Sequence, residues 1–330
     1  MEENNIRPTG IDSLDQMLNG GIPVGATVLL AGSPGAGKTI LAMEWLFNGF
    51  EKYKEPGIYI SLTEPIATAT KNVRKFSFFK QEYMNPTQVY FTDMRGILQG
   101  MDMDRDLNKE DIKLIVDKIR NIVETSGAKR VVLDSITAMA YRLKDRDLIR
   151  SFIFQLGTFL SQSDTNVILT SEVVDDGYSV FGVEEFISDG IIKMVQEKVN
   201  NENIRKLKIV KMRGLDYDSH STSFNISEDG IKLFPRLNYC LNCNVSDKRL
   251  KTGIDGLDEM TRGGYFQGSS ILLTGSSGTG KTIMSLQFLI EALKAGEKCI
   301  YVSFEESRDQ LVRNAKSFGW DLERHEKKTY

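Results

Sequence analysis

The sequence predicts an α/β fold in which a mostly parallel, twisted sheet carries helices on both faces. Strand-length apolar runs alternate with helix-length amphipathic runs between residues 27 and 171, and this alternation is typical of parallel strands joined by helical crossovers. A glycine-rich loop of the kind that binds phosphate follows the first strand. The beginning of the same pattern recurs near residue 252, which predicts the start of a second, identical domain.

Each element of the first copy has its own signal. Strands are short apolar runs, and helices carry apolar residues at three- and four-residue spacing. The predicted strands are Thr27–Ala31, Gly57–Leu62, Val89–Thr92, Arg130–Leu133 and Asn166–Ser171. The predicted helices are Lys38–Tyr53, Ile66–Phe76, Lys109–Thr125 and Asp147–Ser161. Finally, Gly190–Val199 and Ile204–Arg213 predict a hairpin around Asn200–Asn203 that extends the sheet in the antiparallel direction.

The repeat sets the domain organisation. Residues 9–39 align without a gap to residues 252–282, and after a one-residue slip residues 58–65 match residues 300–307. We therefore predict a first domain at 1–235, a linker at 236–248 and the N-terminal part of a second domain at 249–330. Because the second copy stops about a third of the way through its pattern, we expect a fragment of a longer protein rather than a degenerate domain.

Composition and charge favour some classes of protein over others. Hydrophobic residues make up 41% of the 330 positions, charged residues 26%, and the formal net charge is −3, as in ordinary globular proteins. Such a balance gives no broad basic surface for nucleic acid or anionic lipid. The polar segment Met1–Pro8 is no signal peptide, and no apolar run approaches the roughly 18 residues of a membrane span. We expect a cytoplasmic protein without a membrane partner.

The three cysteines predict neither a disulfide framework nor a metal site. Cys240 and Cys243 form one C-x-x-C pair, but a zinc site needs a second pair of ligands. Cys299, His220 and His325 do not lie at ligand spacing. We therefore interpret the pair as two small residues in a linker.

The strongest functional signal is the motif G-x-x-x-x-G-K-[ST], which occurs twice, each time after an apolar run that predicts a strand. Its glycines let consecutive backbone N–H groups point at phosphate oxygens, and the following helix adds its positive N-terminus. The predicted nucleotide-binding residues are Gly32, Ser33, Pro34, Gly35, Ala36, Gly37, Lys38 and Thr39, with Gly275, Ser276, Ser277, Gly278, Thr279, Gly280, Lys281 and Thr282 in the second copy. In such loops the lysine reaches the β- and γ-phosphates of ATP, and the threonine binds Mg²⁺.

A carboxylate completes the predicted metal site. The strand Arg130–Leu133 ends at Asp134, and an aspartate at the end of an apolar strand holds the Mg²⁺ shell opposite the loop threonine in phosphate-loop NTPases. We therefore predict that Thr39, Asp134 and Thr282 are metal ligands.

Several further motifs resemble KaiC and the KaiC-like ATPases of archaea and bacteria, which belong to the RecA superfamily. T-G-I-D-x-L-D opens each repeat, D-S-I-T-A-M begins at Asp134, residues 181–190 read FGVEEFISDG and residues 211–214 read KMRG. The resemblance implies a RecA-like phosphate-loop NTPase fold and a ring, usually a hexamer, with ATP between neighbouring subunits. It also implies that Lys211 and Arg213 act in trans on the γ-phosphate, as an arginine finger does.

The same resemblance implies a general base, the first of two glutamates after the strand that follows the phosphate-loop helix. The second copy has this pair as Glu305 and Glu306, whereas the first has Thr63 and Glu64. A threonine hydroxyl cannot accept a proton at neutral pH, so orienting water falls to Glu64 in the first copy. Two further positions depart from the family: Tyr217 replaces a nucleotide-contacting histidine, and Lys75 stands where the second copy has Ser317, a predicted nucleotide contact.

Three functions fit these signals. The leading interpretation is a slow, ring-forming ATPase that acts as a regulatory switch, with autokinase activity possible in a longer protein. A RecA- or RadA-like DNA-binding recombination ATPase is the first alternative, although the acidic pairs Asp175-Asp176 and Glu184-Glu185 flank the loop that would face a ring channel. A nucleotide sensor that does not hydrolyse ATP is the second alternative, and Thr63 favours it.

Overall fold

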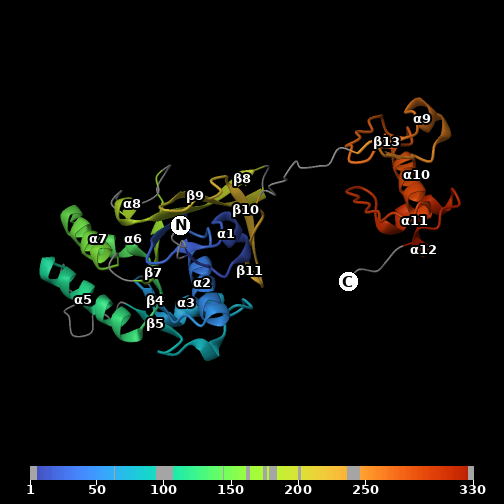
Figure 1. The fold of residues 1–330 in the computed structure, drawn as a ribbon. Helices are drawn as coiled ribbons and strands as arrows, with labels where there is room; N and C mark the ends of the chain where they lie inside the picture. The colour runs from blue at the N-terminus through green and yellow to red at the C-terminus, as the bar shows by residue number, and fades with distance from the viewer. Residues whose placement is uncertain are drawn as a thin grey trace. The chain divides into compact units, whose positions relative to one another are not determined.

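A computed structural model describes residues 6–62, 64–93, 107–143, 145–160, 164–173, 177, 184–199, 202–235 and 246–325 of the chain. The predictions on Thr63, the Asp175-Asp176 pair and the Cys240–Cys243 pair lie outside these residues. The chain divides into two compact units, Met1–Leu237 and Asn238–Tyr330 (Figure 1).

Within the described residues of the first unit, nine strands form one sheet in the order β11-β10-β9-β8-β3-β7-β6-β4-β5. Six of them are parallel: β3 (Thr27–Gly32), β4 (Gly57–Ser61), β5 (Val89–Asp93), β6 (Arg130–Asp134), β7 (Asn166–Glu172) and β8 (Gly190–Val199). The antiparallel strands are β9 (Glu202–Met212), β10 (Thr222–Ser227) and β11 (Gly230–Leu233). This confirms the predicted α/β sheet and its antiparallel hairpin.

Helices cover both faces of this sheet. Side chains of α2 (Lys38–Tyr53) and α3 (Ile66–Val73) pack on one face, and those of α5 (Lys109–Ser126), α6 (Ile136–Leu143) and α7 (Arg146–Leu160) pack on the other. The helices α5 and α7 lie side by side (Figure 1). Every residue of β3, β4 and β6 is therefore buried, which explains why these strands are continuous apolar runs.

The predicted elements agree with these bounds to within three residues, but some elements were not predicted. The helix α3 ends at Val73 instead of Phe76. The helices α1 (Asp12–Met17), α6 and α8 (Glu184–Ile187), the 3-10 helix η1 (Gln81–Tyr83), the short strands β1 (Ile6–Arg7) and β2 (Ile22–Pro23), and the edge strands β10 and β11 are additional.

The motif that opens each repeat has a structural role. Asp15 accepts hydrogen bonds from the backbone N–H groups of Thr9 (2.6 Å) and Gly10 (3.1 Å). In the second unit Asp258 accepts one from the N–H of Thr252 at 2.7 Å. The last aspartate of T-G-I-D-x-L-D thus closes the turn that precedes the first short helix of each copy.

The second unit contains the helices α9 (Asp255–Met260), α10 (Lys281–Lys294), α11 (Arg308–Lys316) and α12 (Leu322–His325), with a short pair of strands, β12 (Arg249–Leu250) and β13 (Tyr265–Phe266). The prediction of a strand before its phosphate loop is wrong for the described structure, in which residues 270–274 form no strand. In the first unit β3 lies between β7 and β8, and β4 between β5 and β6. The matching partner strands are not in this sequence, so Leu272 and Ile300 are 88% and 90% exposed.

No helix in the part of the chain that the structure describes is long and apolar enough to cross a membrane.

Candidate nucleotide and metal site

The phosphate loop of the first unit joins β3 to α2, and its glycines meet specific steric demands. A Cβ atom on Gly32 would lie 2.3 Å from the carbonyl oxygen of Met194. Gly35 and Gly37 have φ angles of 77° and 105°, which other L-residues rarely adopt. A Cβ on Gly37 would also lie 2.8 Å from Ile226 of β10. The backbone of β8 therefore requires glycine at residue 32, and the backbone conformation of the turn requires it at residue 37.

The ammonium group of Lys38 lies against the phosphate loop. Its Nζ donates hydrogen bonds to the carbonyl oxygens of Gly32 (2.7 Å) and Ser33 (3.1 Å). Burial lowers the pKa of Lys38, whereas the carboxylates of Glu172 and Asp134 act in the opposite direction. These two carboxylates stand at the ends of β7 and β6, so the cation lies where the parallel strands present their carboxyl ends. The start of α2 has no side-chain cap, which leaves its N–H groups for an anion.

Asp134 accepts hydrogen bonds from three hydroxyl groups. Thr39 Oγ1 and Tyr59 Oη each donate to its Oδ2 at 2.7 Å, and Thr170 Oγ1 donates to its Oδ1 at 2.6 Å. The donors come from α2, β4 and β7, and Asp134 itself is buried. Burial raises the pKa of Tyr59, and the adjacent Asp134 raises it further, so the phenol stays protonated and donates. The structure thus brings together the two predicted metal ligands, Thr39 and Asp134.

The composition of this cluster fits Mg²⁺. Hydroxyl and carboxylate oxygens are hard ligands, and Mg²⁺ is usually held by one or two carboxylates together with substrate phosphates. Among the described residues there is no group of three or more His, Cys, Asp or Glu side chains that would form an all-protein metal cage.

Glu64 lies close to this cluster. The strand β4 ends at Ser61, whose Oγ donates to the carbonyl oxygen of Glu64 at 2.6 Å, and the N–H of Leu62 donates to the carbonyl oxygen of Asp134 at 2.6 Å. Burial raises the pKa of Glu64, and the negative charge of Asp134 raises it further. Glu64 therefore belongs to the turn after β4 and not to the strand itself.

Lys211 and Arg213 stand at the opposite end of the sheet from the phosphate loop of the same chain. The strand β9 runs antiparallel to β8 and pairs Lys211 with Ile191, which is in turn paired with Leu29 near the start of β3. The phosphate loop follows the other end of β3, after Gly32. A strand rises about 3.3 Å per residue, so the two ends of β3 are well separated.

Their side chains make local contacts. Lys211 Nζ donates to the carbonyl oxygen of Ser188 at 2.7 Å, and burial followed by the charge of Arg213 lowers the pKa of Lys211. The guanidinium of Arg213 lies 3.5 Å from Asp189, and its side chain is 61% exposed. The hydroxyl of Tyr217 donates to the carbonyl oxygen of Val210 at 2.9 Å.

The second phosphate loop repeats the first in its local geometry. Lys281 Nζ donates to the carbonyl oxygens of Gly275 (2.8 Å) and Ser276 (2.9 Å). Thr282 Oγ1 lies 3.5 Å from Glu306 Oε1. Glu305 is exposed. The hydroxyl of Ser317, at the end of α11, donates to the carbonyl oxygen of Asn314 at 2.6 Å.

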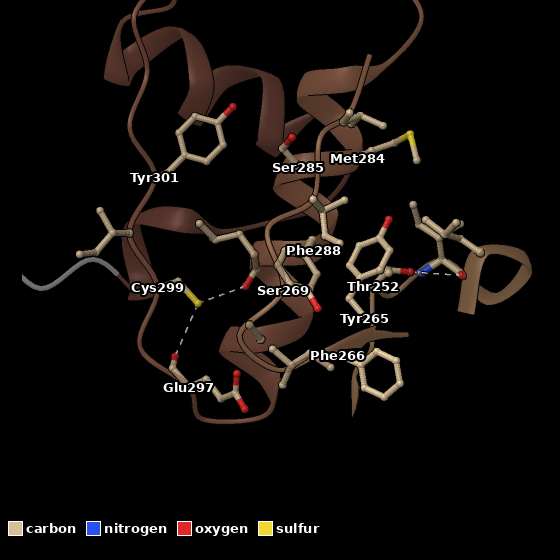
Figure 2. A pocket seen from close by; sticks show the side chains of 18 of the residues that line it. Thr252, Tyr265, Phe266, Ser269, Met284, Ser285, Phe288, Glu297, Cys299 and Tyr301 are labelled. Carbon is tan, nitrogen blue, oxygen red and sulfur yellow. Dashed lines mark hydrogen bonds between the residues drawn. The ribbon is translucent and has the colours of Figure 1, made fainter. Parts of the chain in front are cut away.

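A cavity of about 540 Å³ lies between α10 and the residues that match β3 and β4. Figure 2 shows Met284, Ser285 and Phe288 of α10 on one side and Tyr301 on the other. The rings of Tyr265 and Phe288 meet edge to face at 5.9 Å. The matching positions of the first unit belong to its packed core, so this cavity reflects strand segments that lack sheet partners.

Sequence reasoning had missed Tyr59, Thr170 and Glu172. Each is a polar residue in or at the end of a strand that is mostly or fully buried. That pattern is a usable signal, because a polar group in a covered parallel sheet needs a partner.

Comparison with known proteins finds one family model and several curated sequences that match nearly all of this chain. The model of the family described as "ATPase: KaiC" matches residues 7–238 and 250–330. The circadian clock oscillator protein KaiC of Parathermosynechococcus lividus is 35% identical over 97% of this chain and 59% of the relative. The circadian clock protein KaiC2 of Synechocystis sp. is 34% identical over 96% of this chain and 55% of the relative. The chain therefore spans less than two thirds of the length of these relatives.

A solved structure agrees with the sequence matches. The crystal structure of a KaiC-like protein from the hyperthermophilic archaeon Pyrococcus horikoshii OT3 matches with a TM-score of 0.63 and 30% identity. The match covers 71% of this chain and 100% of that chain.

Proposed function

Because the chain belongs to the KaiC family of ATPases, we propose that it binds ATP with Mg²⁺ at residues 32–39 and hydrolyses it slowly. The direct contact between Thr39 and Asp134, at 2.7 Å, is the observation that carries this proposal. It joins the two side chains that hold Mg²⁺ in phosphate-loop NTPases, and Lys38 lies beside them.

Each residue has a specific task in this proposal. Backbone N–H groups of residues 35 and 37–39 bind the phosphates, helped by the N-terminus of α2. Lys38 exchanges its bonds to Gly32 and Ser33 for the β- and γ-phosphate oxygens. Thr39 and Asp134 hold the cation, which when bound offsets negative charge on the phosphates. With Thr63 at the position of the general base, Glu64 is the remaining carboxylate for orienting the attacking water, and its weak contribution leaves turnover slow.

We also propose that the ATPase works as a ring in which neighbouring chains share each site. Lys211 and Arg213 lie at the C-terminal end of β9, which is level, across β8, with the start of β3, so they are distant from the phosphate loop of their own chain. A positive side chain that is largely exposed, as Arg213 is, is available to a γ-phosphate bound by another chain. A hexamer is the expected size, from the family resemblance.

The role of the ring is proposed to be regulatory. Slow turnover keeps each nucleotide state populated long enough to control a protein partner, and autokinase activity would belong to a longer protein. We propose that 1–235 and 249–330 act as separate nucleotide-binding domains in a cytoplasmic protein. Nucleic acid is not a proposed partner.

Size-exclusion chromatography with and without ATP and Mg²⁺ tests the ring, and equilibrium ATP binding tests the site. We expect Mg²⁺-dependent ATP binding and a shift to a larger species. An unchanged elution volume with saturated sites would contradict the ring. A salt-dependent mobility shift of single-stranded DNA would favour a recombination function instead.

A further inference from the structure

Both carboxylate oxygens of Asp134 are engaged by hydroxyl groups of the protein. Thr39 and Tyr59 share Oδ2, and Thr170 binds Oδ1. The hydroxyl of Thr39 donates its only hydrogen to Asp134, so the lone pairs of Thr39 Oγ1 can bind a cation or a hydrogen-bond donor. A hydroxyl oxygen with free lone pairs beside a carboxylate is suited to a divalent cation. The orientation of the Asp134 carboxylate therefore decides whether Thr39 is ready to bind metal.

Tyr59 is well placed to fix that orientation. It lies on β4, two residues before Ser61, which is paired with Asp134 in the register of β4 and β6. Its side chain is 1% exposed, and its ring lies 5.5 Å from the ring of Phe91. Packing thus holds the ring, and the hydroxyl has no freedom to follow Asp134 if the carboxylate turns.

We propose that Tyr59 is a positioning residue that sets the affinity of the site for Mg²⁺ by holding Asp134 in the orientation at which Thr39 can bind the cation. This inference rests on the proposed function. Hydrogen-bond partners of metal ligands orient those ligands, and their loss typically costs about 10- to 100-fold in metal affinity or activity.

The second copy has a tyrosine at the corresponding position. Tyr301 occupies the position that matches Tyr59, because residues 58–65 align with residues 300–307. Tyr301 is 37% exposed, because the strands that match the neighbours of β4 are not in this sequence. A tyrosine accompanies the phosphate loop in both copies, although the strands around them differ in burial.

The test is Tyr59→Phe in the full chain, which keeps the ring and removes only the hydroxyl. Equilibrium ATP binding is measured at a series of Mg²⁺ concentrations and again in EDTA. We expect the Mg²⁺ concentration for half-maximal enhancement of ATP binding to rise by about tenfold or more, with ATP affinity in EDTA unchanged. Thr170→Val, which removes the donor to the other oxygen, should shift the Mg²⁺ dependence in the same direction.

Tyr83→Phe is the matched control, because Tyr83 packs against Phe50 at 5.1 Å and belongs to the 3-10 helix η1. Its Mg²⁺ dependence should equal that of the parent. A folded Tyr59→Phe variant with the parent's Mg²⁺ dependence would overturn this inference alone. A parent chain whose ATP binding ignores Mg²⁺ would overturn the proposed function as well. Loss of cooperative thermal unfolding in Tyr59→Phe would assign Tyr59 to folding and reject the positioning role.

Discussion

Thr39 and Asp134 are joined by a hydrogen bond of 2.7 Å, although 95 residues separate them in the sequence. Thr39 lies in the first turn of α2, and Asp134 ends β6. Their contact requires β6 to lie near β3 in the sheet, with only β7 between them. The strand order therefore assembles the site, and the phosphate-loop motif supplies only half of it.

The first prediction concerns Lys38, whose ammonium lies over the loop (2.7 Å from the carbonyl oxygen of Gly32). Lys38→Ala should weaken ATP binding at the first site by about 10- to 100-fold. A hydrogen bond to a charged group contributes about 1.5–3 kcal/mol, and about 1.4 kcal/mol is tenfold in affinity. Isothermal titration calorimetry in a Lys281→Ala background isolates this site.

Lys109→Ala is the matched control, because Lys109 is exposed at the start of α5 and should leave ATP affinity unchanged. Parental affinity in the Lys38→Ala variant would show that residues 32–39 do not hold the triphosphate.

The core of the fold could be predicted from the sequence because it depends on local patterns. Each residue of β3 is buried, and a strand covered on both faces gives a continuous apolar run. The edge strand β11 has only four residues, too few to distinguish from a loop. Residues 270–274 match β3 in sequence but form no strand, because strand formation depends on pairing with neighbours that a local pattern does not contain.

The second prediction concerns Glu44, a buried carboxyl on α2. Burial raises its pKa to about 7, while the N–H of Ile231 and the charge of Lys52 act to lower it. In the unfolded chain it titrates near 4.5. Between these pH values the folded state binds more protons than the unfolded state, so stability falls as pH rises from about 4.5 through about 7 and then levels off.

Glu44→Gln should remove this loss. The amide oxygen can still accept the hydrogen bond from Ile231, and the second copy has glutamine, Gln287, at the matching position. A shift of one pKa unit corresponds to about 1.4 kcal/mol, so we expect the variant to be more stable than the parent at pH 8 by up to about 3 kcal/mol, and by little at pH 5. Urea unfolding at both pH values measures the difference. Glu124→Gln, at an exposed position of α5, is the control, and equal gains at pH 5 and pH 8 would refute the titration.

The third prediction tests action between chains. Arg213 lies 3.5 Å from Asp189 at the end of the sheet opposite its own phosphate loop. Chains with Arg213→Ala and chains with Lys38→Ala should each hydrolyse ATP more slowly than the parent. A mixture of the two should recover part of the parent's ATPase activity. In a ring with random order, roughly a quarter of the interfaces in an equimolar mixture pair an intact loop with an intact arginine. Steady-state phosphate release at several mixing ratios measures the recovery.

All chains in that experiment carry Lys281→Ala, so that the second site is silent. Arg150→Ala, at an exposed position of α7, mixed with Lys38→Ala reports the effect of dilution alone. Assembly without recovery at any ratio would exclude a role for Arg213 in a neighbour's site.

The site was only partly predictable for a physical reason. Thr39 belongs to a motif, and Asp134 ends an apolar strand, so both have local signals. Tyr59 reaches Asp134 only because β4 and β6 pair in a register that places Ser61 beside Asp134. Registers between strands that are distant in sequence depend on the whole sheet. No local pattern around residue 59 determines them.

The last prediction concerns Thr63, which lies outside the described residues and stands where the resemblance implies a general base. The first unit has the parts for holding ATP and Mg²⁺, but a threonine cannot take a proton from water at neutral pH. The neighbouring Glu64 lies close enough to Asp134 for the charge of Asp134 to raise its pKa. Glu64 stands one residue beyond the position at which the resemblance implies the base, in a turn where Ser61 Oγ donates to its carbonyl oxygen at 2.6 Å, so we expect its carboxylate to be poorly aimed at the attacking water. We therefore expect the first unit mainly to hold nucleotide, and hydrolysis to depend on Glu305 and Glu306 in a longer protein.

In a Lys281→Ala background, Thr63→Glu should raise the turnover of the first site by tenfold or more, because a positioned general base contributes about 10²–10⁴-fold. Glu64→Gln should change turnover less than twofold, as should the control Glu82→Gln at an exposed position. Single-turnover hydrolysis separates the chemical step from product release, and ATP affinity should be similar in all four chains. A fast parent chain that Glu64→Gln inactivates, with its ATP affinity retained, would identify Glu64 as the base. The first unit would then hydrolyse ATP itself, which would contradict the expectation that it mainly holds nucleotide.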